Sequence, residues 1–323
     1  MLYDVIIIGG GPAGAAAAVY SARKRLKTLL IAESFGGQSV VSDDIQNWIG
    51  EAHISGFDLA QKLEAHVRAF SDVIDIKIGE RAAEIKSTRC SSQERICDFD
   101  VKIDQGGAYE AKALILAMGA RRRKLGVTGE EKFNGKGVAY CSTCDAPLFG
   151  GKRVAVVGGG NAGLEAVVDL FPYASEIYLL HRDTALKGDP AAQEEIKKNS
   201  KLKEIILNSE VLEIEGENFV SGIKYKNIKT GETRSLPVEG VFVEIGSVPN
   251  SEMVKGLVDI DQWGQIKIDA KHASTSHPGI FAAGDITDDP YKQNNISAGD
   301  GVRATLAAYA YLQKRSKQSP VSE

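Results

Sequence analysis

Two glycine-rich turns constrain the fold of this chain more than any other feature. The first turn, GGGPAG at residues 9–14, follows an apolar run at 4–8, and the second, GGGNAG at 158–163, follows an apolar run at 153–157. In a G-x-G-x-x-G turn, the glycines allow a tight bend, close approach of a pyrophosphate to the backbone, and close packing of the following helix. The sequence therefore predicts two nucleotide-binding strand–turn–helix units.

Strand and helix patterns alternate through most of the chain, which favours parallel sheets flanked by helices. Each predicted unit is followed by short β runs with polar turns, between residues 73 and 103 and between residues 205 and 226. Because the same order of elements occurs twice, duplication of a nucleotide-binding fold is the simplest explanation. We predict an α/β fold with two Rossmann-like nucleotide-binding domains, the second inserted in the first, each with a β-meander.

The part of the chain after residue 249 has no glycine turn of its own. We expect it to complete the first domain, which would make that domain discontinuous. Within it we predict a strand at 265–269 and a final helix at 296–313.

Length and charge exclude several classes of protein. The chain has 323 residues, which suggests two domains of ordinary size. It carries 39 Lys and Arg against 43 Asp and Glu, a net charge of −4, so a basic surface for nucleic acid is not expected. The longest apolar run is shorter than the ~18 residues of a membrane span, and the first residues carry no basic leader. We expect a soluble, cytoplasmic protein with no nucleic-acid or membrane partner.

The residue at the end of the second strand of each unit distinguishes the two expected ligands. Glu33 lies 19 residues after Gly14, where a carboxylate accepts hydrogen bonds from ribose hydroxyls. This position suits the adenosine of FAD. In the second unit the corresponding strand ends at His181 and Arg182, where a positive charge suits the 2′-phosphate of NADPH. The alternative is that Glu33 and Arg182 are solvated loop charges.

A cysteine pair, Cys141 and Cys144, lies between the two glycine turns. Two thiols on one short turn can close a disulfide, and the local field can lower the pKa of one of them. The alternative, half of a structural zinc site, needs a second pair of ligands and is disfavoured, so we expect no metal. Cys90 and Cys97 lie in a polar β region. We assign them to ordinary packing or to exposed free thiols, with a regulatory disulfide as the alternative.

The joint order of these motifs resembles the low-molecular-weight thioredoxin reductase family, and more closely the flavoprotein core of alkyl hydroperoxide reductase F. The resemblance covers nearly the whole chain. The matching segments are residues 9–14, 35–38 (FGGQ), 46–50 (QNWIG), 140–145 (YCSTCD), 158–163, 284–285 (GD) and 291–293 (YKQ). The resemblance implies a discontinuous FAD-binding domain at 1–118 and 247–323, an NAD(P)H-binding domain at 119–246 that carries the redox disulfide, and a homodimer.

The motifs and the resemblance together assign the site residues. Cys141 and Cys144 would be the redox pair and Asp145 a proton donor, for which a helix cap is the alternative. The residues expected at FAD are Gly9, Gly11, Pro12, Ala13, Gly14, Glu33, Gly37, Gln38, Asn47, Gly119, Gly284, Asp285, Lys292 and Gln293. The residues expected at NAD(P)H are Gly158, Gly160, Asn161, Ala162, Gly163, His181, Arg182 and Lys187. For Gln38 and Asn47 the alternative is that they satisfy loop backbone.

Two departures from the family pattern concern the cofactors. The family has an arginine after His-Arg and another four residues on, where this chain has Asp183 and Lys187. Because Asp183 would repel a 2′-phosphate, we expect only a modest preference for NADPH over NADH. Met118 replaces a threonine before Gly119, which removes a hydroxyl but keeps the turn.

The predicted function is that of a flavin-dependent disulfide reductase. Electrons would pass from NAD(P)H through FAD to the Cys141–Cys144 disulfide and then to a thioredoxin- or glutaredoxin-like protein. Because the sequence starts at the first FAD strand, whereas alkyl hydroperoxide reductase F proteins carry an amino-terminal extension with thioredoxin-like folds, we expect a separate protein as acceptor. The resemblance also implies rotation of the inserted domain about linkers near Gly119 and Gly246.

Three alternatives to this function stay open. The first is a reductase for the partner of a peroxide-reducing system. The second is a ferredoxin or flavodoxin reductase, which the cysteine pair disfavours. The third is a non-catalytic flavin redox sensor, which rapid bleaching of the flavin by a reduced nucleotide would exclude.

Overall fold

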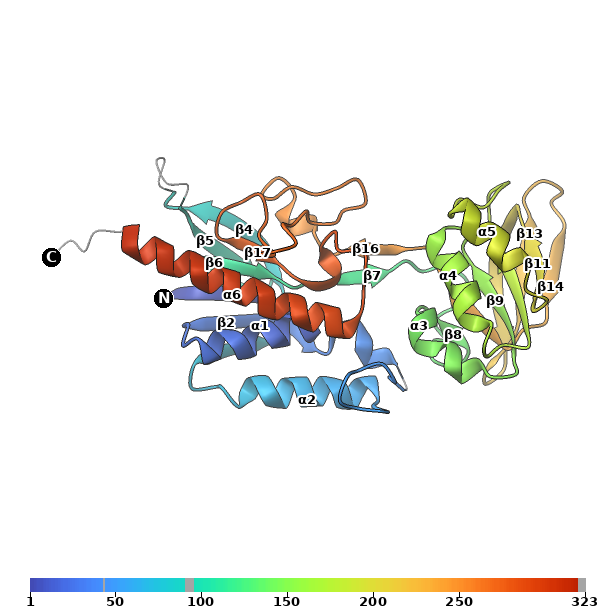
Figure 1. Cartoon of the computed structure of the whole chain (residues 1–323), viewed down its shortest axis with the longest axis horizontal. Helices are drawn as coiled ribbons and strands as arrows, with labels where there is room; N and C mark the ends of the chain where they lie inside the picture. Colours follow the sequence, from blue (N-terminus) through green and yellow to red (C-terminus); the bar gives the residue numbers. More distant parts are fainter. Residues whose placement is uncertain (43, 91–95, 319–323) are drawn as a thin grey trace. The chain divides into compact units, whose positions relative to one another are not determined.

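The computed structural model describes residues 1–42, 44–90 and 96–318. The chain divides into two compact units. Unit 1 comprises Met1–Val41, Trp48–Arg121 and Val248–Glu323, and unit 2 comprises Ser42–Asn47 and Arg122–Ser247. Two short paired strands, β7 (Ala120–Arg122) and β16 (Ser247–Pro249), carry the chain from one unit to the other and back (Figure 1).

The central sheet of unit 1 has seven strands in the order β3-β2-β1-β6-β5-β4, with β17 paired to β6. Its strands are β1 (Leu2–Gly10), β2 (Thr28–Phe35), β3 (Ile74–Ile78), β4 (Ala82–Thr88), β5 (Asp98–Ile103), β6 (Ala108–Leu116) and β17 (Ile280–Ala282). The strands β3, β2, β1, β6 and β17 run parallel. Alternate residues fill two core clusters, with Ile7 and Ile115 in one and Ile6 and Leu114 in the other. Burial on both faces explains why these strands are continuous apolar runs.

Three helices belong to unit 1: α1 (Pro12–Arg23), α2 (Gly56–Arg68) and α6 (Asn294–Gln318). Helices α1 and α6 lie side by side (Figure 1), and Thr305 Oγ1 donates to the carbonyl oxygen of Ala17 at 3.1 Å. A Cβ at Gly301 would lie 2.0 Å from the carbonyl oxygen of Ala13. The two helices can therefore approach this closely only because residue 301 is glycine. Short 3-10 turns are η1 (Gly37–Val41), η3 (Glu252–Val254) and η4 (Gly284–Ile286).

Three details of unit 1 differ from the sequence prediction. The strand predicted to open the meander is β3, which pairs in parallel with β2 at the edge of the main sheet. The strands β4 and β5 are continuous with that sheet: β5 pairs antiparallel with the first half of β6, whose second half pairs with β17, while Ile85 and Phe99 share a core cluster with Ile6 of β1. Residues 265–269 form isolated bridges at Ile266 and Asp269 instead of a strand. A nine-residue β6 can accept two partners along one edge, which a local pattern does not reveal.

Unit 2 repeats the plan of unit 1 on a smaller scale. A five-stranded parallel sheet has the order β11-β10-β9-β15-β8, and a separate antiparallel sheet has the order β12-β13-β14. The strands are β8 (Val138–Ala139), β9 (Arg153–Val157), β10 (Glu176–Leu180), β11 (Leu202–Ile206), β12 (Ser209–Gly216), β13 (Val220–Asn227), β14 (Thr233–Leu236) and β15 (Gly240–Val243). The helices are α3 (Ser142–Asp145), α4 (Asn161–Leu170) and α5 (Pro190–Lys197), with the 3-10 turn η2 (Ala146–Phe149) after α3. This architecture confirms the predicted α/β class with two Rossmann-like units.

Helix lengths and hydropathy bear on membrane insertion. Among the described residues, no helix combines the length and the apolar character that crossing a membrane requires.

Candidate functional site

The three motif glycines of the first turn have different surroundings. A Cβ at Gly9, whose φ is 114°, would lie 2.2 Å from the carbonyl oxygen of Ala117, and one at Gly14 would lie 1.8 Å from the carbonyl oxygen of Gly9. These two positions are therefore closed to any side chain. A Cβ at Gly11 would instead be 3.9 Å from its nearest described neighbour, the Cα of Gly37. The backbone at Gly11 is thus open where a pyrophosphate would approach.

The helix after each glycine turn begins without a side-chain cap among the described residues. Gly11 is the N-cap of α1 and Gly160 is the N-cap of α4, and Ala162 lies exposed in the first turn of α4. By contrast, the side chains of Ser55 and Asp189 cap α2 and α5. Unpaired N–H groups at a helix start attract phosphate groups. The helices that follow the two glycine turns therefore keep their anion-binding ends open.

The first turn lines a cavity of about 950 Å³ in unit 1. This volume lies near the upper end of the ~300–1,000 Å³ usual for small-molecule and cofactor sites. Ten of the residues predicted for FAD line the cavity, namely Gly9, Gly11, Pro12, Ala13, Glu33, Gly37, Gln38, Gly119, Gly284 and Asp285. They come from the ends of β1, β2 and β6 and from α1, η1 and η4. The structure thus brings together segments from both parts of the discontinuous unit.

The other four residues predicted for FAD are not among those that line this cavity. Gly14 is a packing position of α1. Lys292 is half-buried, its Nζ donates to a backbone carbonyl oxygen at 2.6 Å, and burial lowers its pKa. The carbonyl of Gln293 accepts a backbone N–H at the start of α6. Asn47 belongs to the segment Ser42–Asn47, which groups with unit 2.

Charged and polar residues that the sequence analysis missed also line the cavity. Arg81 lies 3.5 Å from Glu33, so the carboxylate expected to bind ribose has a cationic partner. Arg121 donates to Asn250 Oδ1 at 2.8 Å and pairs with Glu252 at 2.5 Å. No motif marks Arg81, Asn250 or Glu252. The one sequence signal was Arg121, which lies two positions after the predicted Gly119 turn.

The second glycine turn has the same geometry as the first. A Cβ at Gly158, whose φ is 137°, would lie 2.1 Å from the carbonyl oxygen of Glu244, and one at Gly163 would lie 1.9 Å from the carbonyl oxygen of Gly158. No described atom lies within 4 Å of a Cβ at Gly160. Asn161 Oδ1 accepts a backbone N–H at 2.7 Å from the cap of α5. This hydrogen bond ties the turn to the start of α5.

The end of β10 carries fewer free positive charges than the sequence suggests. His181 is buried against Gly159, where a Cβ would lie 2.5 Å from its ring, and burial lowers its pKa. His181 is therefore a neutral packing group at pH 7. Asp183 Oδ2 lies 2.6 Å from Lys187 Nζ, and this pairing lowers the pKa of Asp183. Arg182 is exposed.

The Cys141–Cys144 disulfide lies on the helical turn α3, which follows β8. Its Cα atoms are 5.3 Å apart, and both cysteines are half-exposed. Asp169 of α4 accepts hydrogen bonds from Ser142 Oγ at 2.8 Å and from Thr143 Oγ1 at 3.2 Å. Both residues between the cysteines are thus bound to one carboxylate. The two cysteines are thus partly exposed while the turn that carries them is held, which suits thiol–disulfide exchange.

A buried carboxyl that the sequence analysis missed contacts this turn. Glu244 follows β15, is 8% exposed, and accepts a hydrogen bond from the backbone N–H of Ser142. Burial raises its pKa to about 7; Asp145 and Asp169 add to the rise, whereas Arg122 and the hydrogen bond oppose it. Glu244 therefore exchanges its proton near neutral pH. The one sequence signal was an acidic residue directly after an apolar strand.

The chain before the redox turn is held by a second buried carboxyl. Glu130 is 1% exposed and accepts hydrogen bonds from the backbone of Leu125 and Gly126 and from the hydroxyl of Tyr140 at 3.0 Å. Burial raises the pKa of Tyr140, so its hydroxyl stays a donor. The residue that precedes Cys141 is thereby fixed. Asp145, the predicted proton donor, is half-exposed, and its backbone N–H donates to the carbonyl of Cys141 at 2.9 Å.

The structure corrects the assignment of Cys90 and Cys97. They are neither free thiols nor simple packing residues, because they form a disulfide between the end of β4 and the start of β5. Antiparallel pairing of these strands ends at Thr88 and Asp98, and it brings the two cysteine Cα atoms to 4.1 Å. The spacing of the cysteines in the sequence does not reveal this pairing of β4 with β5. In the described part of the chain, no three metal-binding side chains gather as a metal site would require.

Known proteins that resemble this chain include one matching family and several relatives of similar sequence. Residues 3–310 match the family of pyridine nucleotide-disulphide oxidoreductases. Alkyl hydroperoxide reductase F of Pseudomonas aeruginosa is 42% identical over 315 residues, which cover 97% of this chain and 59% of that protein. A protein named NADH dehydrogenase from Bacillus subtilis is 42% identical over 310 residues, 96% of this chain and 57% of its own length. This chain thus spans less than two-thirds of the length of these relatives.

Solved structures match over nearly the whole length of both chains. Thioredoxin reductase from Streptococcus pyogenes superposes with a TM-score of 0.86 at 36% identity, over 97% of this chain and 99% of that one. Thioredoxin reductase from Giardia duodenalis gives a TM-score of 0.86 at 30% identity, with the same coverage.

Proposed function

The chain belongs to the pyridine nucleotide-disulphide oxidoreductase family, and we propose that it uses NADH and FAD to reduce the disulfide of a small protein through Cys141 and Cys144. One observation carries this proposal. The half-exposed Cys141–Cys144 disulfide lies on a turn held by Asp169, in the unit that also contains the second glycine turn. An accessible disulfide on a fixed turn is what exchange with a partner protein requires.

The cavity of unit 1 supports FAD as the resident cofactor. The open backbone at Gly11, beside Gly37 in the cavity wall, would hold the pyrophosphate, and Glu33 would accept hydrogen bonds from the ribose. Gly284 and Asp285 line the same cavity and would bind the ribityl and phosphate region. When bound, FAD supplies the two-electron chemistry that links a nicotinamide to a disulfide.

The second glycine turn would bind the pyridine nucleotide, with its pyrophosphate at Gly160 and the open end of α4. The sequence predicted a modest preference for NADPH, and the ion pair at the end of β10 argues for NADH. Lys187 is already paired with Asp183, and buried His181 adds no positive charge, which leaves Arg182 to attract a 2′-phosphate. The similarity to a protein named NADH dehydrogenase supports the same choice.

The exchange step would use both cysteines of the turn. In the reduced protein, the Cys141 thiolate would bond to one sulfur of the partner disulfide, and the other partner sulfur would leave as a thiolate and take up a proton. Cys144 would then attack the Cys141 sulfur, which releases the partner as a dithiol and restores the Cys141–Cys144 disulfide. Asp145 would supply a proton during this step. Glu244 would act as a positioning residue, because its hydrogen bond holds Ser142 between the cysteines.

Serine variants of the redox pair test the proposal. In Cys141→Ser protein loaded with FAD, NADH should still bleach the flavin absorbance, while reduction of a thioredoxin-like disulfide should be lost. Cys144→Ser should also lose turnover with the protein substrate. A Cys90→Ser/Cys97→Ser double variant is the matched control and should retain full activity. Protein-disulfide reduction that survives in either redox variant would refute the relay through this pair.

The acceptor is the second part of the proposal. We propose a thioredoxin- or glutaredoxin-like protein, and the 42% identity to alkyl hydroperoxide reductase F supports a component of a peroxide-reducing system as the second candidate. Cys144→Ser keeps the attacking Cys141 but cannot resolve its mixed disulfide, so the partner should stay attached and be identified by mass spectrometry. Homodimer formation stays a prediction that analytical ultracentrifugation tests, and cytoplasmic localisation is likewise untested.

A further inference from the structure

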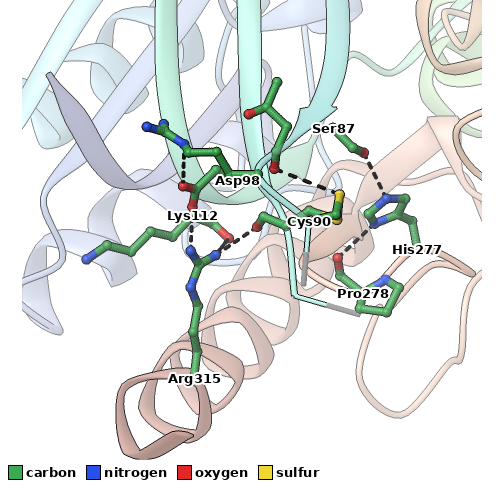
Figure 2. The surroundings of a disulfide bond; sticks show 10 residues. Ser87, Cys90, Asp98, Lys112, His277, Pro278 and Arg315 are labelled. Atoms are coloured by element: carbon green, nitrogen blue, oxygen red, sulfur yellow. Dashed lines mark hydrogen bonds and ion pairs between the residues drawn. A yellow bond between two sulfur atoms is a disulfide. The ribbon is translucent and has the colours of Figure 1, made fainter. Parts of the chain in front are cut away.

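The second disulfide of the protein, Cys90–Cys97, lies in unit 1 and takes no part in the proposed relay. We propose that the Cys90–Cys97 disulfide is a second thiol–disulfide exchange site, which a protein dithiol opens at the sulfur of Cys90, and that its opening loosens the anchoring of α6. This inference rests on the proposed function in one respect: the electron donor is a protein dithiol, which is the class of product that the proposed reductase forms. Figure 2 shows the disulfide beside Arg315 of α6 and His277.

The two sulfur atoms differ in accessibility. Cys90 is exposed, whereas Cys97 is 5% exposed and packs in the core cluster that contains Ile85 and Phe99. An incoming thiolate can therefore reach Cys90 and not Cys97. Exposed disulfides are the ones that thiols reduce readily in a folded protein, while buried structural disulfides resist reduction. The exposure of Cys90 thus sets the direction of attack.

The sheet does not need this disulfide. Six residue pairs join β4 and β5, and the last of them, Thr88 with Asp98, lies next to the disulfide on its strand side, outside the loop that it closes. The strand β5 is also paired with β6 along its other edge. The disulfide closes a short loop, since its cysteines are 7 positions apart, and a short loop adds less stability than a long one. Cys90 and Cys97 can therefore separate while β4 and β5 stay paired.

Arg315 connects the disulfide to the last turns of α6. Its guanidinium donates to the carbonyl oxygens of Cys97 at 2.8 Å and Lys112 at 3.1 Å, and it also binds the carboxylate of Asp98 (Figure 2). Asp98 is held in turn by Arg89 at 3.0 Å. The carbonyl oxygen of Cys97, which accepts one of these hydrogen bonds, lies at the start of β5, where the disulfide is attached. Opening the disulfide should therefore weaken one of the three contacts through which Arg315 anchors the last turns of α6.

His277 lies near the disulfide but is already engaged. Its ring nitrogens are 2.9 Å from Ser87 Oγ and 2.8 Å from the carbonyl oxygen of Pro278 (Figure 2). Because both nitrogens are occupied, the ring is not the base that activates an incoming thiol. The exchange therefore depends on the thiolate of the partner.

The proposed exchange takes place in two steps. A thiolate of the partner dithiol bonds to Cys90 Sγ, the Cys90–Cys97 bond breaks, and Cys97 leaves as a thiolate that takes a proton from water. The second thiol of the partner then attacks the mixed disulfide and releases Cys90 as a thiol. The partner is oxidised to a disulfide, and Cys90 and Cys97 together gain two electrons and two protons.

The first test isolates this disulfide from the proposed relay. Full-length Cys141→Ser/Cys144→Ser protein, loaded with FAD, is mixed without NADH with a chemically reduced, desalted thioredoxin, then alkylated and analysed by peptide mass spectrometry. We expect Cys90 and Cys97 to become alkylated at least about tenfold faster than with an equal concentration of a monothiol. Alkylation only after denaturant is added would overturn the proposal. Failure of the proposed function would be seen separately, in wild-type protein with NADH.

The second test concerns α6. Hydrogen exchange of residues 310–317 should rise about threefold or more when Cys90 and Cys97 are reduced, while α1 stays unchanged. Arg315→Gln should show the faster exchange in both redox states. Lys314→Gln, an exposed neighbour on the same helix, is the matched control and should keep the redox dependence. Equal exchange in the oxidised and reduced wild-type protein would refute the link to α6.

Discussion

The two glycine turns share one backbone geometry but have chemically different neighbours. In unit 1 the carbonyl oxygen that excludes a Cβ at Gly9 belongs to Ala117, and in unit 2 the one that excludes a Cβ at Gly158 belongs to Glu244. Ala117 and Glu244 therefore occupy equivalent places at the end of a strand beside the turn. Ala117 lines the cavity that suits FAD, while Glu244 binds the main chain of the redox turn. The duplicated backbone sets where a nucleotide can bind, and the side chains beside it set what each unit does.

The ends of the second strands show the same contrast. Glu33 pairs with Arg81 at the cavity of unit 1, whereas in unit 2 Asp183 pairs with Lys187 beside buried His181. An acidic group suits ribose hydroxyls in both units. In unit 2, however, the acidic group also pairs with Lys187, which leaves Arg182 as the positive charge for a 2′-phosphate.

The largest expected effect comes from the glycines that are closed in both turns. Gly14→Ala and Gly163→Ala would each force a Cβ to less than 2 Å from a backbone oxygen. Because the backbone must move to make room for the Cβ, we expect each variant to lose more than about 4 kcal/mol of unfolding free energy, a loss that only severe substitutions cause. Yield of soluble protein and thermal melting check this. Melting at the wild-type temperature would show that the two turns are looser than the structure has them.

The second largest effect is a dependence of the unfolding free energy on pH, which we expect for unit 2 because it contains Glu244. The pKa of Glu244 is raised to about 7 from 4.5, so the folded state holds its proton more tightly than the unfolded state. Unfolding free energy should therefore fall as pH rises from about 4.5 to about 7, by up to about 3 kcal/mol in total. Glu244→Gln should gain stability at pH 8 and nothing at pH 4.5 in urea unfolding followed at unit 2. Ala117→Gly, at the equivalent place in unit 1, is the control: it retains Glu244, so the change in unfolding free energy that it causes should be the same at pH 8 and at pH 4.5.

The open glycines should give smaller and selective effects. An Ala side chain at residue 11 or 160 fits the protein but occupies the space left for a pyrophosphate. We expect Gly11→Ala to weaken FAD binding by about 30-fold, or about 2 kcal/mol, with NADH affinity unchanged. Gly160→Ala should weaken NADH binding by a similar factor and leave the affinity for FAD unchanged. Titration of each cofactor by fluorescence measures both, and loss of both affinities in one variant would contradict the separate assignment of the two turns.

The smallest effect concerns the choice of nucleotide. Asp183→Arg removes the partner of Lys187 and adds a positive charge, so the ratio of kcat/KM for NADPH to that for NADH should rise about tenfold. Asp183→Asn should produce a part of the same change. If neither variant alters the ratio, the end of β10 does not face the 2′ position, and the proposed preference for NADH would lose its basis.

Local patterns were enough for the parts of the molecule that depend on local chemistry. The two glycine turns, the strands and helices around them and the Cys141–Cys144 pair were all predicted, because each needs particular residues at fixed spacing in one short segment. A glycine at φ near 114° or 137°, with a carbonyl oxygen where a Cβ would be, leaves almost no other residue possible. Such positions are visible in a sequence before any fold is known.

Only the tertiary structure decided the contacts between distant segments. Asp169 and Glu244 reach the redox turn from α4 and from the end of β15, and Cys90 meets Cys97 because β4 and β5 pair in one register. The pairing of Lys187 with Asp183, on which the proposed preference for NADH rests, likewise depends on side-chain placement. Periodicity tells which residues are buried but not which strand ends meet. The amino-acid sequence therefore determined the two glycine turns and the Cys141–Cys144 pair, and three-dimensional packing determined the charges and hydrogen bonds that surround them.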